Sequence, residues 1–257
     1  MSSKTFIRSI ILLMVLLYSN IAYNQQANAD SMWKKSYKNI VRYNLSGALL
    51  FGADKYVIFG YERVVNPHQS FSVNFGTVGL PKFVSINTDS FSIQKDLKNN
   101  GFNVSADYRF YLANENRYSA PHGVYIGPYV SYNHFDRNND WEFQQSSSSQ
   151  KLISTETQFN IFTAGAELGY QFVFWKRLTL DMVLIGPGVS TYNLKTKIEG
   201  DLTDEERQNL RDALKQLISQ KFPGMNYALS DKEFNANGVL NTTSVGFRYL
   251  VHIGFAF

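Results

Sequence analysis

Cysteine is absent from all 257 residues of the chain. This excludes a disulfide framework, a thiolate metal site and a lipid-modified amino-terminal cysteine. Proline is scarce, with 6 residues, whereas Phe and Tyr number 20 and 16. This composition favours strands and turns over a helical bundle. The formal net charge of +4 includes two basic residues near the amino terminus, so the remainder is nearly neutral and does not support a nucleic-acid partner.

The first residues are organised like an export signal. Lys4 and Arg8 supply a positive end, residues 10–17 (IILLMVLL) supply a short apolar core, and Ala27-Asn28-Ala29 fits the small-x-small cleavage pattern. The alternative, an uncleaved membrane anchor, is disfavoured because this apolar run is too short, and no run of about 18 apolar residues occurs after it. The expected division is therefore a signal peptide over 1–29, cleaved within about 22–29, and a mature domain over 30–257.

The mature chain alternates between apolar and polar residues in segment after segment. In 101–112 (GFNVSADYRFYL) the even-numbered positions are apolar or aromatic and the odd-numbered ones are mostly polar. A period of two predicts strands, and most of these are near the roughly 9–11 residues that cross a bilayer at a tilt. The expected strands are 39–50, 56–64, 70–80, 101–112, 123–135, 159–174, 178–193 and 247–257.

Soluble barrels alternate as well, so the connections and the lysines decide between the two environments. Long connections at 81–100, 136–157 and 194–238 alternate with short ones, as in an up-and-down outer-membrane barrel with both termini in the periplasm. Lysines fall at strand ends or in connections, and a lipid-facing lysine would cost roughly 2–4 kcal/mol at the bilayer midplane. We therefore expect an all-β fold, an eight-stranded antiparallel up-and-down transmembrane β-barrel.

The carboxyl-terminal segment Tyr249-Leu250-Val251-His252-Ile253-Gly254-Phe255-Ala256-Phe257 resembles the last strand of outer-membrane proteins. In those proteins alternating aromatics and a final Phe are read by the barrel-assembly machinery, so the resemblance implies an assembly signal at Tyr249, Phe255 and Phe257. The stretches 41–47 (VRYNLSG), 59–63 (FGYER) and 123–129 (GVYIGPY) resemble a family of uncharacterised small outer-membrane barrels, similar in general shape to OmpA and OmpX. That resemblance implies placement in the cell outer membrane and no particular activity.

One segment departs from the β pattern. Thr203-Asp204-Glu205-Glu206 forms a capping box, apolar residues then recur at helical spacing, and Pro223-Gly224 ends the run. The sequence therefore predicts an amphipathic helix at 203–222, within an extracellular loop at 194–238. Three interpretations remain open: a helix folded onto its own loop or the barrel rim, a partner-binding helix, or a helix lying on the membrane surface.

Candidate catalytic chemistry is sparse. The four histidines, at positions 68, 122, 134 and 252, show no metal-ligand spacing. Some small outer-membrane barrels are lipid-modifying enzymes with a Ser and a His near the outer rim, and Ser131 with His134 would be the candidates here. These residues are three apart on a strand and should point to opposite faces. We expect no catalytic residue, no metal and no cofactor.

Seven charged residues are expected to face the barrel interior: Arg42, Glu62, Asp107, Arg109, Glu167, Asp181 and Arg248. They could form an ion or proton path, but their nearly balanced charges favour a structural network that fills a narrow barrel. With a loop centred near Ala53, Arg42 and Glu62 should lie directly opposite each other on the first two strands. Arg109 and Asp181 should lie at similar depth.

The function expected from sequence is a non-enzymatic outer-membrane barrel that is structural or contacts partners through its extracellular loops. The alternatives are a lipid-modifying hydrolase or acyltransferase and a narrow pore. Expected partners are membrane lipid, the barrel-assembly machinery during biogenesis and an unidentified extracellular partner. We expect a monomer that binds no nucleic acid.

Overall fold

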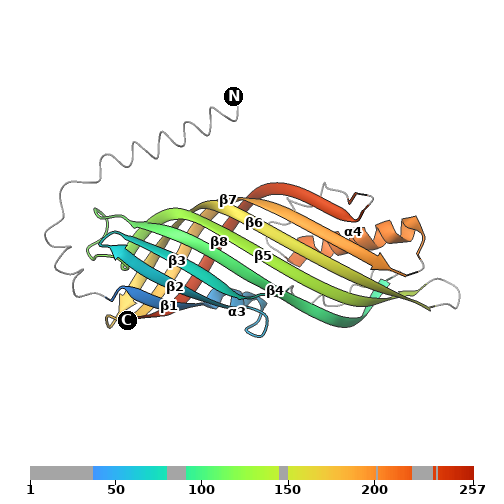
Figure 1. The fold of residues 1–257 in the computed structure, drawn as a ribbon, viewed down its shortest axis with the longest axis horizontal. Coiled ribbons are helices and arrows are strands. Elements are labelled where there is room, and N and C mark those ends of the chain that lie inside the picture. Colours follow the sequence, from blue (N-terminus) through green and yellow to red (C-terminus); the bar gives the residue numbers. More distant parts are fainter. Residues whose placement is uncertain (1–36, 80–90, 145–149, 201, 222–233, 236) are drawn as a thin grey trace, which may run out of the picture.

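The computed structural model describes residues 37–79, 91–144, 150–200, 202–221, 234–235 and 237–257. Eight strands pair in chain order and the last pairs with the first, closing an antiparallel barrel (Figure 1). This confirms the predicted all-β, eight-stranded up-and-down barrel. The predicted signal peptide 1–29 lies outside the described residues. The strands are β1 Asn39–Asn44, β2 Val57–Asn66, β3 Gln69–Thr77, β4 Phe91–Tyr111, β5 Gly123–Gln144, β6 Gln150–Phe174, β7 Leu178–Glu199 and β8 Val239–Ala256.

The strands differ in length, and this difference divides the molecule into two parts. β1 to β3 have 6 to 10 residues, whereas β4 to β8 have 18 to 25. Pairing of β3 with β4 ends at Thr77 and Phe102, but β4 stays paired with β5 as far as Phe91 and Phe143. Beyond this point the long strands continue as an open sheet (Figure 1). We call this sheet the extension, and the closed part, which contains the short turns, the turn half.

Outward-facing side chains change character where the turn half meets the extension. On β5 the outward positions from Val124 to Val130 are apolar, whereas Asp136, Asn138 and Asp140 follow on the same face. Lysine follows the same division, because the lysines of the described strands all lie in the extension, at Lys95, Lys98, Lys151, Lys195 and Lys197.

Inward-facing positions change in the opposite sense. Phe135, Phe159 and Leu194 begin the extension on β5, β6 and β7, and all three point inward and are buried. On these three strands apolar residues therefore appear on the inner face, where Arg137, Asn139, Thr155, Thr157 and Thr196 are buried as well. The predicted loops 81–100 and 136–157 were wrong over most of their described length, because this change of face looks like the end of a strand when one apolar face is followed along the sequence.

The prediction of one strand over 39–50 was also wrong. β1 ends at Asn44, and α3 follows at Leu45–Phe51. The Asn44 side chain caps this helix by accepting a hydrogen bond from the backbone N–H of Gly47 at 3.1 Å. Gly47 also packs closely on Tyr56, since an added Cβ would lie 3.1 Å from its ring. The helix ends at Gly52, whose φ of +98° suits glycine.

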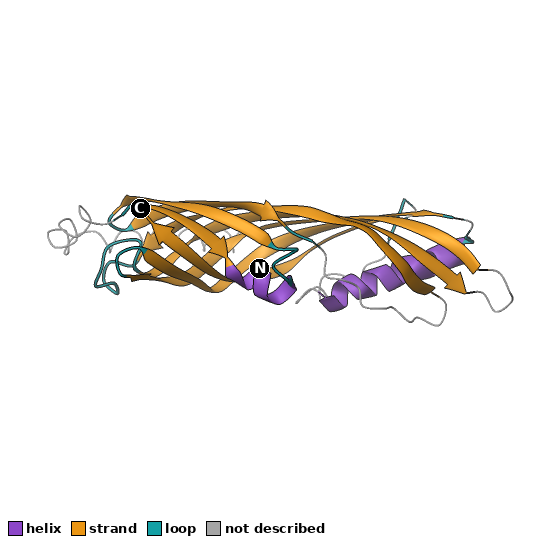
Figure 2. Cartoon of the chain, turned by 90° about the horizontal axis from the view of Figure 1, so that it is seen from below, coloured by secondary structure: helices purple, strands orange, loops and turns teal. Residues whose placement is uncertain are grey.

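The predicted amphipathic helix is found as α4, Asp204–Lys221, beside the extension (Figure 2). Its capping box is formed: the N–H of Glu206 donates to Thr203 Oγ1 at 3.2 Å, and the N–H of Thr203 donates to Glu206 Oε2 at 2.7 Å. Leu210 and Leu214 are buried. The predicted loop 194–238 began too early, because β7 continues to Glu199. Neither described helix is long and apolar enough to cross a membrane.

Candidate functional site

A buried ionic network fills the interior of the turn half. The structure places all seven predicted charged residues on the inward face, and each has a relative exposure of 9% or less. They come from six of the eight strands: Arg42, Glu62, Asp107, Arg109, Glu167, Asp181 and Arg248. Alternation places each of these residues on the inward face, and the register of the paired strands brings them close together inside the barrel.

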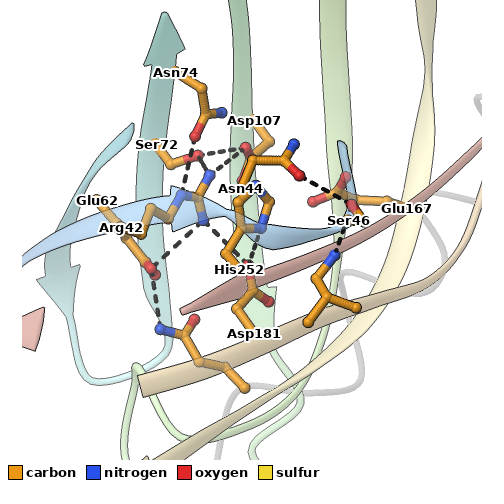
Figure 3. A network of polar contacts seen from close by, with 12 residues as sticks. Arg42, Asn44, Ser46, Glu62, Ser72, Asn74, Asp107, Glu167, Asp181 and His252 are labelled. Atoms are coloured by element: carbon orange, nitrogen blue, oxygen red, sulfur yellow. Dashed lines mark hydrogen bonds and ion pairs between the residues drawn. The ribbon is translucent and has the colours of Figure 1, made fainter. Parts of the chain in front are cut away.

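Arg42 lies at the centre of this network (Figure 3). Its guanidinium donates to Asn74 Oδ1 at 3.0 Å, to Asp181 Oδ2 at 3.2 Å and to Asp107 Oδ2 at 3.2 Å. Glu62 Oε2 lies 3.8 Å from its Nη1. One arginine therefore contacts groups on four other strands, β2, β3, β4 and β7.

Arg109 is a second centre and is fully buried. It donates to Asp107 Oδ1 at 2.6 Å, to Asp181 Oδ2 at 2.8 Å and to Gln171 Oε1 at 3.0 Å. Its guanidinium also lies over the Tyr125 ring, 4.4 Å from the centroid. The expected proximity of Arg109 and Asp181 is thus a direct ion pair in the structure.

The predicted register of β1 and β2 was wrong by two residues. Glu62 lies opposite Ile40, and Arg42 lies opposite Gly60. The prediction placed the connection too late because it did not include α3. An added Cβ at Gly60 would come within 3.0 Å of the Arg42 side chain. Glycine at this position therefore leaves the space through which Arg42 crosses toward its acidic partners.

Several neutral residues complete the network, and sequence reasoning did not include them in it. Tyr125 donates to Asp181 Oδ1 at 2.7 Å, and Tyr111 and Gln171 both donate to Glu62, at 3.1 Å in each case. His252 Nδ1 lies 3.2 Å from Asp181 Oδ2. Alternation already places these side chains on the inward face, so that periodicity was the signal that could have found them.

Arg248 and Glu167 have fewer hydrogen-bond partners than the other charged residues of the network. They form an ion pair at 3.5 Å, and Arg248 lies over the Tyr129 ring, 4.8 Å from the centroid. In the described structure, both Glu167 oxygens and all three Arg248 guanidinium nitrogens are buried without a hydrogen-bond partner. Buried polar groups normally have such partners, so this pair has donors and acceptors that could form further hydrogen bonds.

Apolar clusters close the interior on both sides of the network. Toward the turns, Ile40, Val64, Tyr111, Tyr125 and Ala256 belong to one buried cluster. Toward the extension, a second cluster includes the stacked rings of Phe135, Phe159 and Tyr192, with Ile58, Val78, Leu194 and Leu240. The charged layer is therefore enclosed between two layers of apolar side chains.

Ser131 and His134 do not come together. Ser131 faces inward and accepts from Asn103 Nδ2 at 3.3 Å. His134 faces outward, with Nδ1 2.6 Å from Asn160 Oδ1 and Nε2 3.2 Å from Asp136 Oδ2. Within the described part of the chain, no group of three or more His, Asp or Glu residues could hold a metal ion.

The three aromatic residues of the expected assembly signal all face outward. Tyr249, Phe255 and Phe257 have exposed fractions of 61%, 48% and 50%. Phe257 follows β8 and is joined to the start of β1, because its N–H donates to the carbonyl of Asn39 at 2.8 Å. The carboxyl terminus thus forms part of the seam that closes the barrel.

Comparison with known proteins gives a family and, among matching solved structures, a distant one. No curated protein matches the chain. The crystal structure of Acinetobacter baumannii CarO2 aligns over 86% of this chain and 98% of that chain, with 9% identity and a TM-score of 0.36. A similarity this low carries no argument about either fold or function. Residues 41–209 match the model described as "Protein of unknown function (DUF3575)". This match spans well over half of the chain, which therefore belongs to the DUF3575 family.

Proposed function

We propose that this chain is an outer-membrane β-barrel without catalytic activity, which acts as a structural or surface-interaction protein through its extension. The observation that carries the proposal is the apolar outer band of the turn half. Large exposed hydrophobic residues on its outward face include Val73, Phe75, Val104, Val130, Phe162 and Phe247. A water-soluble barrel would instead expose polar side chains there.

The height of the band matches a bilayer. On β5 the outward positions are apolar or aromatic from Val124 to Tyr132, a stretch comparable to the roughly 9–11 residues that cross a membrane at a tilt. The 25 residues of β6, by contrast, span about 80 Å at about 3.3 Å per residue, far more than the roughly 30 Å hydrocarbon core. The extension therefore stands in water.

Outer-membrane barrels carry short turns on the periplasmic side and longer structures outside. We accordingly place the termini and short turns in the periplasm and the extension with α4 outside the cell. Tyr249, Phe255 and Phe257 then supply the signal for the barrel-assembly machinery. The polar outer face of the extension is then the surface that an extracellular partner would contact.

The filled interior supports a role other than conduction. An eight-stranded barrel has room inside for little more than side chains, and here a charged layer lies between two apolar clusters. Ser131 faces inward and His134 faces outward, so these two side chains cannot act together as nucleophile and base, which supports the proposal of a barrel without catalytic activity. Among the residues that the structure describes, none gives specific support to a narrow pore or to a lipid-modifying enzyme.

A matched pair of lysine substitutions on β5 tests the membrane placement. Val130→Lys introduces a charge into the apolar band, whereas Asn138→Lys introduces it on the same face in the extension. In lipid, Val130→Lys should destabilise the folded barrel by roughly 2–4 kcal/mol, and Asn138→Lys should have little effect. The measurement is urea unfolding of protein refolded into phospholipid vesicles, followed by the heat-modifiable shift on a gel. Equal stability of the two variants would contradict membrane placement.

A further inference from the structure

The sheet of the extension has two free edges. β1 pairs with β8 only as far as Asn44 and His252, and β3 pairs with β4 only as far as Thr77 and Phe102. Beyond these points β8 and β4 continue through the extension (Figure 1). No described strand pairs with this part of β8 on the side away from β7, or with this part of β4 on the side away from β5.

The free edge of β4 carries features that discourage pairing with a further strand. The register of β4 with β5 shifts between Ile93 and Lys95 and again between Asp96 and Lys98. Bulges and charged residues, especially lysine, are the usual means by which proteins prevent a free edge from pairing with another chain.

The free edge of β8 has neither feature. The register of β8 with β7 runs without a shift from Arg248 to Val239, and residues 239–247 (VLNTTSVGF) contain no charged residue and no proline. The outward side chains change here from Val245 to Thr243 and Asn241, all of them exposed, so the first residues of β8 belong to the polar extension. We call the free side of residues 239–243 the β8 edge.

Hydrogen bonds at two positions show which backbone groups face the free side of β8. The N–H of Val251 donates to Ser46 Oγ at 3.3 Å, where α3 packs on β8. At the start of the strand, Val239 donates to Asn235 Oδ1 and accepts from the Asn235 N–H, both at 2.9 Å. Alternate residues of an antiparallel strand direct their N–H and C=O groups to the same neighbour, so the odd-numbered residues of β8 face the free side.

Asn241 and Thr243 therefore direct their backbone groups to the β8 edge. Within the described part of the chain, no hydrogen bond reaches the N–H or C=O of either residue on this side. The even-numbered Thr242 and Ser244 are paired with Tyr192 and Ser190 of β7. The β8 edge thus presents two donors and two acceptors at the spacing that a further strand requires.

We propose that the β8 edge binds an extended segment of an extracellular protein, which pairs with β8 as an additional strand. This proposal rests on the proposed surface-interaction role and gives that role a place and a class of partner. In strand addition, main-chain hydrogen bonds give affinity and alternate side chains give specificity. The inward side chains of the segment lie beside buried Leu240 and Thr242, so they are small or apolar, and the outward ones are polar.

A fluorescein-labelled peptide that copies residues 188–195 (GVSTYNLK) serves as the probe, because this part of β7 already pairs with residues 239–246 of β8. Fluorescence anisotropy with the full barrel in lipid nanodiscs should show binding that saturates at one peptide per barrel and is absent with empty nanodiscs. Methylation of one alternate set of peptide nitrogens should abolish binding, whereas the other set should tolerate it, because only one side of the peptide faces β8.

A matched pair of variants at Thr243 tests the site on the barrel. Thr243→Pro removes an edge-facing N–H and should weaken peptide binding about tenfold or more. The barrel should still fold, because this N–H takes no part in the pairing with β7 and proline is tolerated on edge strands. Thr243→Val keeps the N–H and should bind like the wild type.

Hydrogen exchange of the wild-type barrel, measured for each residue by NMR, tests the site without a variant. The amides of Asn241 and Thr243 should exchange rapidly in the free protein and become protected when the peptide binds. Those of Thr242 and Ser244, which pair with β7, should be protected in both states.

The proposal would be overturned if the folded wild type bound no peptide, if Thr243→Pro and Thr243→Val bound it equally, or if the peptide left exchange at Asn241 and Thr243 unchanged. Cross-linked dimers of the peptide-free barrel that Thr243→Pro removes would also overturn it, since they would assign the β8 edge to a second copy of the chain. Each of these results would leave membrane placement standing, because the lysine pair on β5 tests placement separately.

Discussion

The turn half and the extension share the long strands β4 to β8, yet the two faces of these strands have opposite character in the two parts. In the turn half, apolar side chains face outward and a charged network lies inside. In the extension, charged and amide side chains face outward, while Phe135, Phe159 and Leu194 are buried inside. A strand therefore does not carry a fixed apolar face: the same strand exposes apolar side chains in the turn half and polar ones in the extension.

The two parts are consequently held together by different forces. The network gains nothing from hydrophobic burial, and ion pairs out of water roughly repay the desolvation of their charges. Its members nevertheless depend on one another, because each charge removed leaves a partner unpaired. The extension is stabilised like a soluble protein, by packing a sheet against a helix, and its surface ion pairs contribute little.

Arg109→Gln should produce the largest loss of stability in the molecule. The substitution leaves Asp107 and Asp181 with a weaker set of donors in a fully buried site. Removing one partner of a buried pair costs roughly 3–5 kcal/mol. Urea unfolding of the refolded barrel measures this loss.

The matched control lies in the extension. Lys197 and Glu199 form an ion pair at 3.0 Å in which both side chains are more than half exposed. Glu199 raises the pKa of Lys197 through its hydrogen bond and its negative charge. Lys197→Gln should leave the unfolding midpoint unchanged, since exposed pairs contribute little. A comparable loss from both variants would mean that the network is not distinguished by its burial.

Leu194→Ala should weaken the extension and spare the turn half. Leu194 is fully buried among the apolar residues at the base of the extension, and its truncation should cost roughly 2–4 kcal/mol. Hydrogen exchange should accelerate at 150–159 and 192–199 while 162–172 stays protected. Leu168→Ala, outward-facing on β6 and 36% exposed, is the control and should change exchange far less. Uniform acceleration along β6 would show that the two parts unfold together.

The turn half was the more predictable part of the molecule. A period of two identifies its strands and its inward charges, because one face stays apolar over the whole stretch. The contacts between these charges were harder to predict from the sequence. Arg42 reaches its partners across Gly60, and the two-residue difference between the predicted and the observed register of β1 and β2 depends on α3. That helix follows from local interactions of Asn44, which compete with the strand pattern around it.

The extension was predicted poorly for a different reason. The change of apolar face between Tyr132 and Phe135 on β5 mimics a strand end, although the backbone pairing continues to Gln144. Sequence alternation reports which face is apolar, and it cannot by itself distinguish a loop from a strand whose apolar side chains move to the other face. The helix in the same region was predictable because its capping box is a purely local signal.

Thr203→Ala should cause the smallest of these stability losses, and it should show which elements stabilise the extension. The substitution removes the acceptor for the Glu206 N–H at the first turn of α4, a loss of about 1 kcal/mol. The helix keeps a second attachment, since Arg207 donates to the carbonyls of Ile198 at 2.9 Å and Gly200 at 2.8 Å.

Limited proteolysis of the refolded barrel should therefore show α4 cleaved about fivefold faster in Thr203→Ala, because a loss of about 1 kcal/mol multiplies the open population by that factor. Exchange in β6 and β7 should remain close to the wild type. Gln216→Ala, at an exposed position of the same helix, is the control and should not accelerate cleavage. If Thr203→Ala also exposed the amides of 192–199, α4 would have to be counted as part of the buried core of the extension. Unchanged exchange there would instead assign the stability of the extension to its strands and to the apolar cluster at its base.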